Sequence, residues 1–97
     1  MTYNWNDQKN DLLKKERGIS FEEIIILISE DNLVDILEHP NKEKYPDQYL
    51  YLINLENYIY VVPFVVNAEK EEIFLKTIFP SRGYTKKYLN TGGNHVK

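Results

Sequence analysis

The chain has 97 residues, which is enough for one hydrophobic core and too short for two. It contains no cysteine, so disulfides, thiolate metal sites and thiol nucleophiles are excluded. Its formal charge of −3 argues against a general nucleic-acid coat protein, because phosphate binding depends mainly on Lys and Arg contacts. No segment has the length of a membrane helix and the N-terminus lacks a secretion signal, so we expect a cytoplasmic protein without membrane contact.

Two helices are expected in the N-terminal third. The segment Asn6–Arg17 has a sparse apolar stripe, and Asn6 or Asp7 is available as its N-cap. Ser20 then caps a second helix, Phe21–Ser29, which has acidic residues in its first turn. The contiguous isoleucines of this second segment are also compatible with a buried strand, and the Ser-Phe-Glu-Glu start favours the helix.

Four strands are expected to follow, joined by short connections. Leu33–Glu38 would be the first, and Gln48–Leu55 with Tyr58–Val66 forms the clearest hairpin. The fourth would be Glu72–Phe79. Short connections between successive strands favour an antiparallel meander. Pro63 interrupts the third strand, and since proline cannot donate to a ladder it implies an edge position or a bulge.

The C-terminal part is expected to form one short helix and a tail. Pro80 ends the last strand, and Ser81–Leu89 has room for two basic helical turns. Residues 91–97 have the composition of a flexible tail. The sequence therefore predicts a single α+β domain over residues 1–90, with two N-terminal helices, a four-stranded antiparallel sheet and a short C-terminal helix.

The charges are distributed unevenly along this chain. Between Glu22 and Glu38 there are six carboxylates and no basic residue. Between Lys76 and Lys97 there are five basic residues and no acidic one. We therefore expect a molecule with an acidic side and a basic side.

The two histidines offer little for catalysis or metal binding. His39 is adjacent to Glu38, and such a pair can act as a general base near neutral pH, although a loop histidine before a proline is the simpler interpretation. His95 lies in the tail. With two histidines, no cysteine and no phosphate-binding glycine loop, we expect no metal site and no cofactor.

The strongest functional signal is a group of basic and aromatic residues near the C-terminus. Proteins hold single-stranded RNA by stacking bases on aromatic rings and neutralising phosphates with cations. A lysine inside an apolar strand is costly unless it points to an open face. The simpler alternative is a helix that is basic to suit its own dipole, with tyrosines that are structural. The group comprises Lys76, Arg82, Tyr84, Lys86, Lys87 and Tyr88.

Both ends of the chain contain short segments that resemble one bacterial protein family. The segments Tyr3–Asn10, Leu13–Lys15 and Gly18–Glu23, with the ending Ile78–Arg82, resemble the start and end of BrnT-type toxins. The likeness covers nearly the whole chain. Two departures stand out. The stretch Lys-Glu-Arg-Gly is one residue longer than the family's Lys-His-Gly and lacks its histidine, and Pro-Ser-Arg stands where the family has Ser-Ala-Arg.

This resemblance implies a RelE-like fold and a toxin of a type II toxin–antitoxin operon. Such toxins are metal-independent endoribonucleases that arrest growth by cutting RNA, and a cognate DNA-binding antitoxin holds them inactive. By resemblance, Arg82 would stabilise the phosphorane charge with help from Lys76, while Tyr84 or Tyr88 would stack a base or relay a proton. The residues expected to bind flanking RNA are Lys9, Lys15, Lys86 and Lys87.

Two hypotheses of different classes follow. The first is a ribonuclease toxin neutralised by a partner that covers the face around Arg82. The second is a catalytically silent binding module with the same fold, which contributes only to a complex. Arg82 tied to a carboxylate, or Lys76 and Arg82 on opposite sides of the sheet, would count against the ribonuclease.

Overall fold

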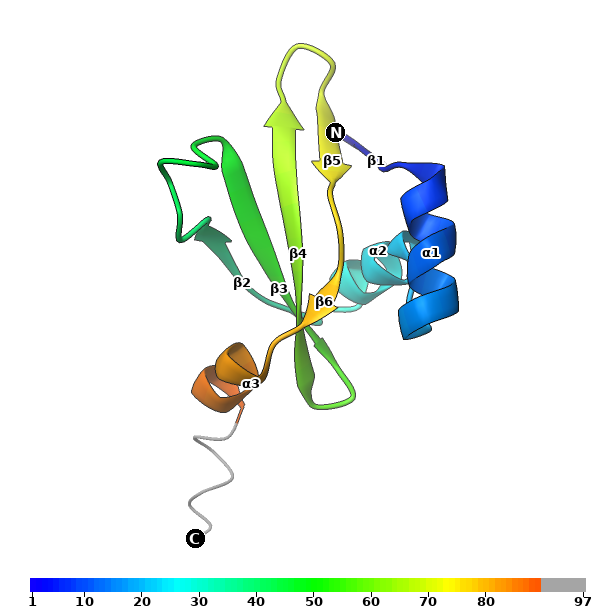
Figure 1. The fold of residues 1–97 in the computed structure, drawn as a ribbon, viewed down its shortest axis with the longest axis vertical. Coiled ribbons are helices and arrows are strands. Elements are labelled where there is room, and N and C mark those ends of the chain that lie inside the picture. Colours follow the sequence, from blue (N-terminus) through cyan, green and yellow to red (C-terminus); the bar gives the residue numbers. More distant parts are fainter. Residues whose placement is uncertain (90–97) are drawn as a thin grey trace, which may run out of the picture.

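The computed structural model describes residues 1–89 and has three helices and one mixed sheet (Figure 1). The helices are α1 (Asp7–Arg17), α2 (Phe21–Ser29) and α3 (Arg82–Tyr88). The strands are β1 (Thr2–Asn4), β2 (Leu33–Glu38), β3 (Gln48–Leu55), β4 (Tyr58–Asn67), β5 (Glu72–Leu75) and β6 (Phe79–Pro80). Within residues 1–89, no helix is long and apolar enough to cross a bilayer. The predicted tail and His95 lie outside the described residues.

The sheet contains the predicted antiparallel strands and one that the sequence did not predict. Its order is β1-β5-β4-β3-β2, and β6 pairs with β4. The pairs β2–β3, β3–β4 and β4–β5 are antiparallel, whereas β1 runs parallel to β5, with Tyr3 opposite Ile73. The prediction of a purely antiparallel, four-stranded sheet is therefore wrong. A polar strand of three residues has no alternation pattern that could reveal it.

The strand predicted over residues 72–79 is broken in two. Leu75 pairs with Phe64 and Phe79 pairs with Val61. The segment from Leu75 to Phe79 therefore advances by four residues where β4, which faces it, advances by three. The extra residue makes a bulge between β5 and β6. From β6 the chain continues directly into α3 (Figure 1).

Pro63 lies opposite this bulge. Its carbonyl accepts a hydrogen bond of 2.8 Å from the backbone N–H of Lys76, while its own nitrogen has no proton to donate. Because β4 has neighbours on both sides, the edge position considered for Pro63 is wrong. The alternative, a bulge in the third strand itself, is not observed, because β4 pairs with β3 in unbroken register through Pro63 and the extra residue lies on the strand that faces it.

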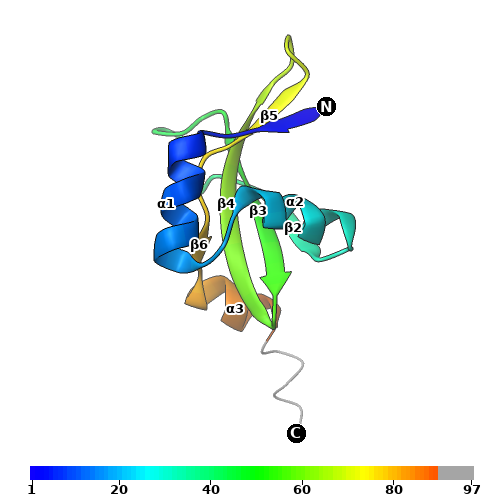
Figure 2. The same cartoon turned by 90° about the vertical axis from the view of Figure 1, so that its right-hand side faces the viewer.

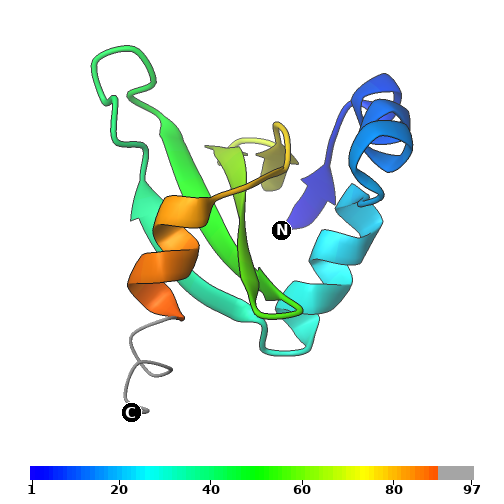
Figure 3. The same ribbon diagram turned by 60° about the horizontal axis from the view of Figure 1, so that its bottom comes forward.

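The sheet separates two apolar layers of different size. On one face, α1 and α2 pack on the sheet in a core of ten buried residues, which includes Phe21 of α2 and both Tyr51 and Ile53 of β3. On the other face, α3 packs on a smaller cluster of four buried residues, which includes Leu50 and Leu52. Side chains alternate along a strand, so these two sets point in opposite directions. Figure 2 views the sheet from the side of α1 and α2, and Figure 3 shows α3 standing apart from them. We call the two sides the α1–α2 face and the α3 face.

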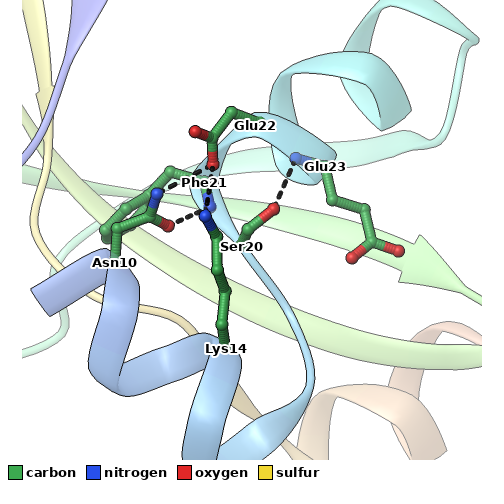
Figure 4. Close-up of polar contacts among 6 residues, drawn as sticks. All are labelled: Asn10, Lys14, Ser20, Phe21, Glu22 and Glu23. Atoms are coloured by element: carbon green, nitrogen blue, oxygen red, sulfur yellow. Dashed lines mark hydrogen bonds and ion pairs between the residues drawn. The ribbon is translucent and has the colours of Figure 1, made fainter. Parts of the chain in front are cut away.

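A buried asparagine joins the first two helices. Asn10 is 3% exposed, and its Oδ1 accepts a hydrogen bond of 2.8 Å from the backbone N–H of Phe21 (Figure 4). Its Nδ2 donates at 2.8 Å to Oε1 of Glu22, and this bond is the main cause of the lowered pKa of that carboxyl group. Ser20 caps α2, because its Oγ accepts the N–H of Glu23 at 3.1 Å.

Candidate functional site

Lys76 lies on the α3 face beside the bulge. Its backbone bonds to Pro63, which is opposite the buried Leu50 of the α3-face cluster. Its Nζ lies 5.6 Å from the centre of the Phe74 ring, so the cation sits over an aromatic side chain. The residue is exposed. The expectation that this lysine points to an open face agrees with its position.

Arg82 is the first residue of α3 and is exposed. Ser81 holds it in place, because the N–H of Ser81 donates to the carbonyl of Ile59 at 2.9 Å and its Oγ caps the helix. Within residues 1–89, neither Arg82 nor Lys76 has a carboxylate oxygen within 4.0 Å. The ion pairs in that part of the chain are Lys14–Glu22 and Lys42–Glu38. Both cations therefore keep their charge available for a ligand.

Thr85 anchors α3 to the sheet. It is 8% exposed, and its Oγ1 accepts a hydrogen bond of 2.8 Å from the backbone N–H of Ile59 in β4. The same hydroxyl donates to the carbonyl of Ser81 at 2.7 Å. The sequence analysis assigned no role to Thr85. A hydroxyl residue one turn after the N-cap, on the inner side of a short helix, was the available signal.

Tyr88 links the other end of α3 to the edge strand β2. Its hydroxyl donates a hydrogen bond of 2.7 Å to Oδ2 of Asp35, whose Oδ1 accepts the backbone N–H of Ile36 at 2.8 Å. The bond from Tyr88 is the main cause of the lowered pKa of Asp35, and the same bond raises the pKa of Tyr88. The phenolic proton is therefore held in place at neutral pH. Sequence analysis counted Asp35 only as one charge of the acidic run.

Tyr84 is the less constrained of the two tyrosines on α3. It is half-buried and packs on the same apolar cluster as Tyr88, with the ring centres 6.2 Å apart. Its hydroxyl makes no hydrogen bond to another residue of the described range. A proton-transfer or stacking role is thus open to Tyr84 in a way that it is not to Tyr88.

The four lysines expected to bind flanking RNA fall into two groups. Lys86 and Lys87 are exposed in the last turn of α3. Lys9 and Lys15 belong to α1, which packs on the other face of the sheet. The structure therefore places six of the eight predicted residues at the β5–β6 bulge and α3, and the two early lysines in a different layer. The group at the bulge and α3 comprises Lys76, Arg82, Tyr84, Lys86, Lys87 and Tyr88.

Comparisons with protein-family models, with curated proteins and with solved structures gave no match. The resemblance to BrnT-type toxins therefore stays a prediction from the sequence.

The pair of Glu38 and His39 does not form a catalytic couple. Glu38 bonds to Lys42 at 2.8 Å, and Nδ1 of His39 accepts the backbone N–H of Asn41 at 3.1 Å. The His39 ring packs against the ring of Tyr45, with 4.4 Å between the centres and the two planes tilted. Within residues 1–89, no group of three or more His, Asp or Glu side chains is arranged to hold a metal ion.

An open hollow of about 610 Å³ lies where β3 begins and β4 ends. Its lining includes the exposed apolar side chains of Tyr49 and Val66, together with the carboxylates of Asp47 and Glu69. The lining contains no basic residue. Its charge suits a basic or apolar ligand, so the candidate site for an anionic substrate is the region of Lys76 and Arg82.

Proposed function

We propose that this protein is the toxin component of a type II toxin–antitoxin pair and is an endoribonuclease that needs no metal ion. The observation that carries the proposal is the pair of exposed cations beside the α3 face, Lys76 and Arg82, which have no carboxylate partner among residues 1–89. The likeness of both chain ends to BrnT-type toxins supports the same function. The expected partners are an RNA substrate and a cognate DNA-binding antitoxin.

The proposed reaction is an internal transesterification of RNA. The 2′-oxygen attacks the adjacent phosphorus and forms a new P–O bond, and the bond from phosphorus to the 5′-oxygen breaks. A base takes the proton of the 2′-hydroxyl and the departing 5′-oxygen gains one, so a 2′,3′-cyclic phosphate and a 5′-hydroxyl result. Negative charge grows on the phosphorane oxygens, where a fixed cation lowers the barrier.

The side chains divide these tasks according to their contacts. Arg82 would stabilise the phosphorane, because it sits at the junction of sheet and helix with no competing carboxylate. Lys76 would bind the same or the next phosphate. Tyr84 would assist proton transfer or stack on a base, while Tyr88 fixes α3 through its bond to Asp35.

Induced expression in a bacterial host tests the proposal, with colony survival and total RNA integrity followed in parallel. The wild type should arrest growth and fragment RNA, and Arg82→Ala should relieve both effects. Arg17→Ala is the matched control, because it removes an exposed arginine from the end of α1 and should leave both effects unchanged. Circular dichroism of the purified variants checks that each is folded. A harmless wild type with intact RNA would contradict the proposal.

A catalytically silent binding module is the second candidate. The hollow beside Tyr49 and Val66 supports it, since these side chains are exposed and apolar and the lining of the hollow contains no basic residue. This candidate predicts a protein that binds its partner and leaves RNA intact. The expression experiment separates the two, because only the ribonuclease depends on Arg82.

A further inference from the structure

The β5–β6 bulge arranges aromatic rings and a cation in one line on the α3 face. Three alternate residues of β4 lie opposite these side chains, one residue opposite each side chain. Residues directly opposite each other share a face of the sheet, and so do alternate residues of one strand. Val61 is buried in the α3-face cluster, which fixes the face for the whole line. The opposed pairs are Val65 with Phe74, Pro63 with Lys76, and Val61 with Phe79.

The bulge decides where the side chain of Phe79 points. Leu75 is fully buried on the α1–α2 face, and in an unbroken strand Phe79 would share that face with it. The extra residue reverses the alternation and leaves Phe79 on the α3 face, 37% exposed. A large aromatic ring is thus held in solvent beside Lys76 and three residues before Arg82.

We propose that this line binds one strand of RNA, with a base stacked on Phe79 and phosphates held by Lys76 and Arg82. The inference rests on the proposed function and adds two features to it: the substrate is single-stranded where it is cut, and Phe79 is the residue that stacks its base. Aromatic stacking between cations is the usual way in which proteins bind single strands.

The exposed ring of Phe79 favours a single strand over a duplex. A ring can stack only on a base that has an uncovered face. Inside a duplex, neighbouring base pairs cover both faces of each base, whereas an unpaired base can turn one face to the ring. The Phe79 side chain, 37% exposed, therefore suits an unpaired base.

The charges near the line indicate where the strand would end. From Lys76 to Leu89 the chain has four basic residues and no acidic one. At the other end, Glu72 lies two residues before Phe74 and accepts a hydrogen bond of 2.8 Å from Asn4. A fixed carboxylate there repels phosphates, so the strand would extend from Phe74 towards α3.

Binding of a fluorescein-labelled, 2′-O-methylated RNA oligonucleotide, followed by fluorescence anisotropy, tests the inference. This probe lacks the attacking hydroxyl and cannot be cut. Phe79→Ala should weaken binding by about fivefold or more, because base stacking contributes at least that factor. Ile36→Ala is the matched control, since Ile36 is a 50% exposed apolar residue that pairs with Tyr51 on the other face.

Phe79→Trp gives a second readout that does not depend on a truncated side chain. It should keep the affinity, and its fluorescence should be quenched when the oligonucleotide binds, with Trp5 of the wild type as the baseline. Unchanged affinity in Phe79→Ala, or absent quenching in Phe79→Trp, would overturn the inference. Equal binding of a blunt duplex of the same sequence, or no binding of the oligonucleotide, would overturn it as well.

Cleavage of unmodified RNA by the same proteins separates this inference from the proposed function. A wild type that binds through Phe79 and cuts nothing would sink the ribonuclease and leave the single-strand site standing. A wild type that cuts RNA with Phe79→Ala equally active and equally tight would sink the single-strand site alone.

Discussion

The two faces of the sheet use their side chains differently. On the α1–α2 face, two helices of 11 and 9 residues join the sheet in a cluster of ten buried residues, to which the helices themselves contribute. On the α3 face, one helix of seven residues lies over a cluster of four, all of them in β3 and β4. An isolated helix of seven residues is unstable in water, so α3 depends on what attaches it to the sheet. The large face supplies most of the stability, and the small face leaves rings and cations in solvent where a ligand can reach them.

Removal of a large side chain from the α1–α2 face should have the largest effect on stability. Phe21 is completely buried and stacks on Trp5 with 5.6 Å between the ring centres. We expect Phe21→Ala to lower the free energy of unfolding by about 3–5 kcal/mol, measured by urea denaturation. Phe79→Ala on the α3 face should cost about 1–2 kcal/mol, because that ring is partly in solvent. Equal losses in both variants would remove the distinction between the faces.

The attachment of α3 should respond to loss of a single hydroxyl group. Thr85→Val keeps the shape of the side chain but leaves the buried N–H of Ile59 without its partner. We expect a loss of about 1–3 kcal/mol and faster hydrogen exchange in α3 than in α1. Thr85→Ser keeps the hydroxyl and should retain most of the protection. If α3 exchanged at the wild-type rate in Thr85→Val, the helix would be held by its apolar contacts alone.

Local signals predicted most of the elements. Asn6, Ser20 and Ser81 are the observed N-caps, and alternation located β2 and the β3–β4 hairpin at their observed starts. The features that the sequence did not predict depend on contacts between residues far apart in the chain. The parallel pairing of β1 with β5 joins segments about 70 positions apart, and the bulge exists only relative to β4.

In the candidate site too, residues with a local sequence pattern were predicted, and residues defined by distant contacts were not. Lys76 and Arg82 were found because a cation in an apolar strand and a cation after a strand are local patterns. Thr85 and Asp35 were missed as anchors, since their partners lie 26 and 53 positions away in the sequence. No local pattern records such contacts.

The four lysines offer a test of which layer binds RNA. Lys86→Glu, on α3, should weaken binding of the labelled oligonucleotide several-fold and reduce the dependence of log K on log salt by about one. Lys15→Glu makes the same charge change on α1, over the opposite face, and should have a smaller effect on both quantities. Affinity measured at several salt concentrations gives both the strength of binding and its salt dependence. An equal effect of Lys15→Glu would mean that RNA also contacts α1, as the sequence first suggested.

The bond between Tyr88 and Asp35 should give the α3 face a small dependence of stability on pH. The pKa of Asp35 is lowered from 3.8 in the folded protein, so near and below that value the unfolded state binds more protons and stability falls as the pH falls. The raised pKa of Tyr88 has the opposite sign, because above pH 10.0 the folded state keeps a proton that the unfolded state loses. The bond therefore stabilises the protein between these limits and is lost at both ends.

Tyr88→Phe removes the hydroxyl and should flatten this pH dependence at both ends. The free energy of unfolding, measured by urea denaturation from pH 3 to 6 and again around pH 10, would show the difference from the wild type. Glu22 also has a lowered pKa, but its partner Asn10 is unchanged in the variant, so the difference between the two curves isolates Asp35. Tyr84→Phe is the control and should follow the wild type. Coincident curves for Tyr88→Phe and the wild type would mean that solvent replaces this bond without cost, which would leave Thr85 as the main polar anchor of α3.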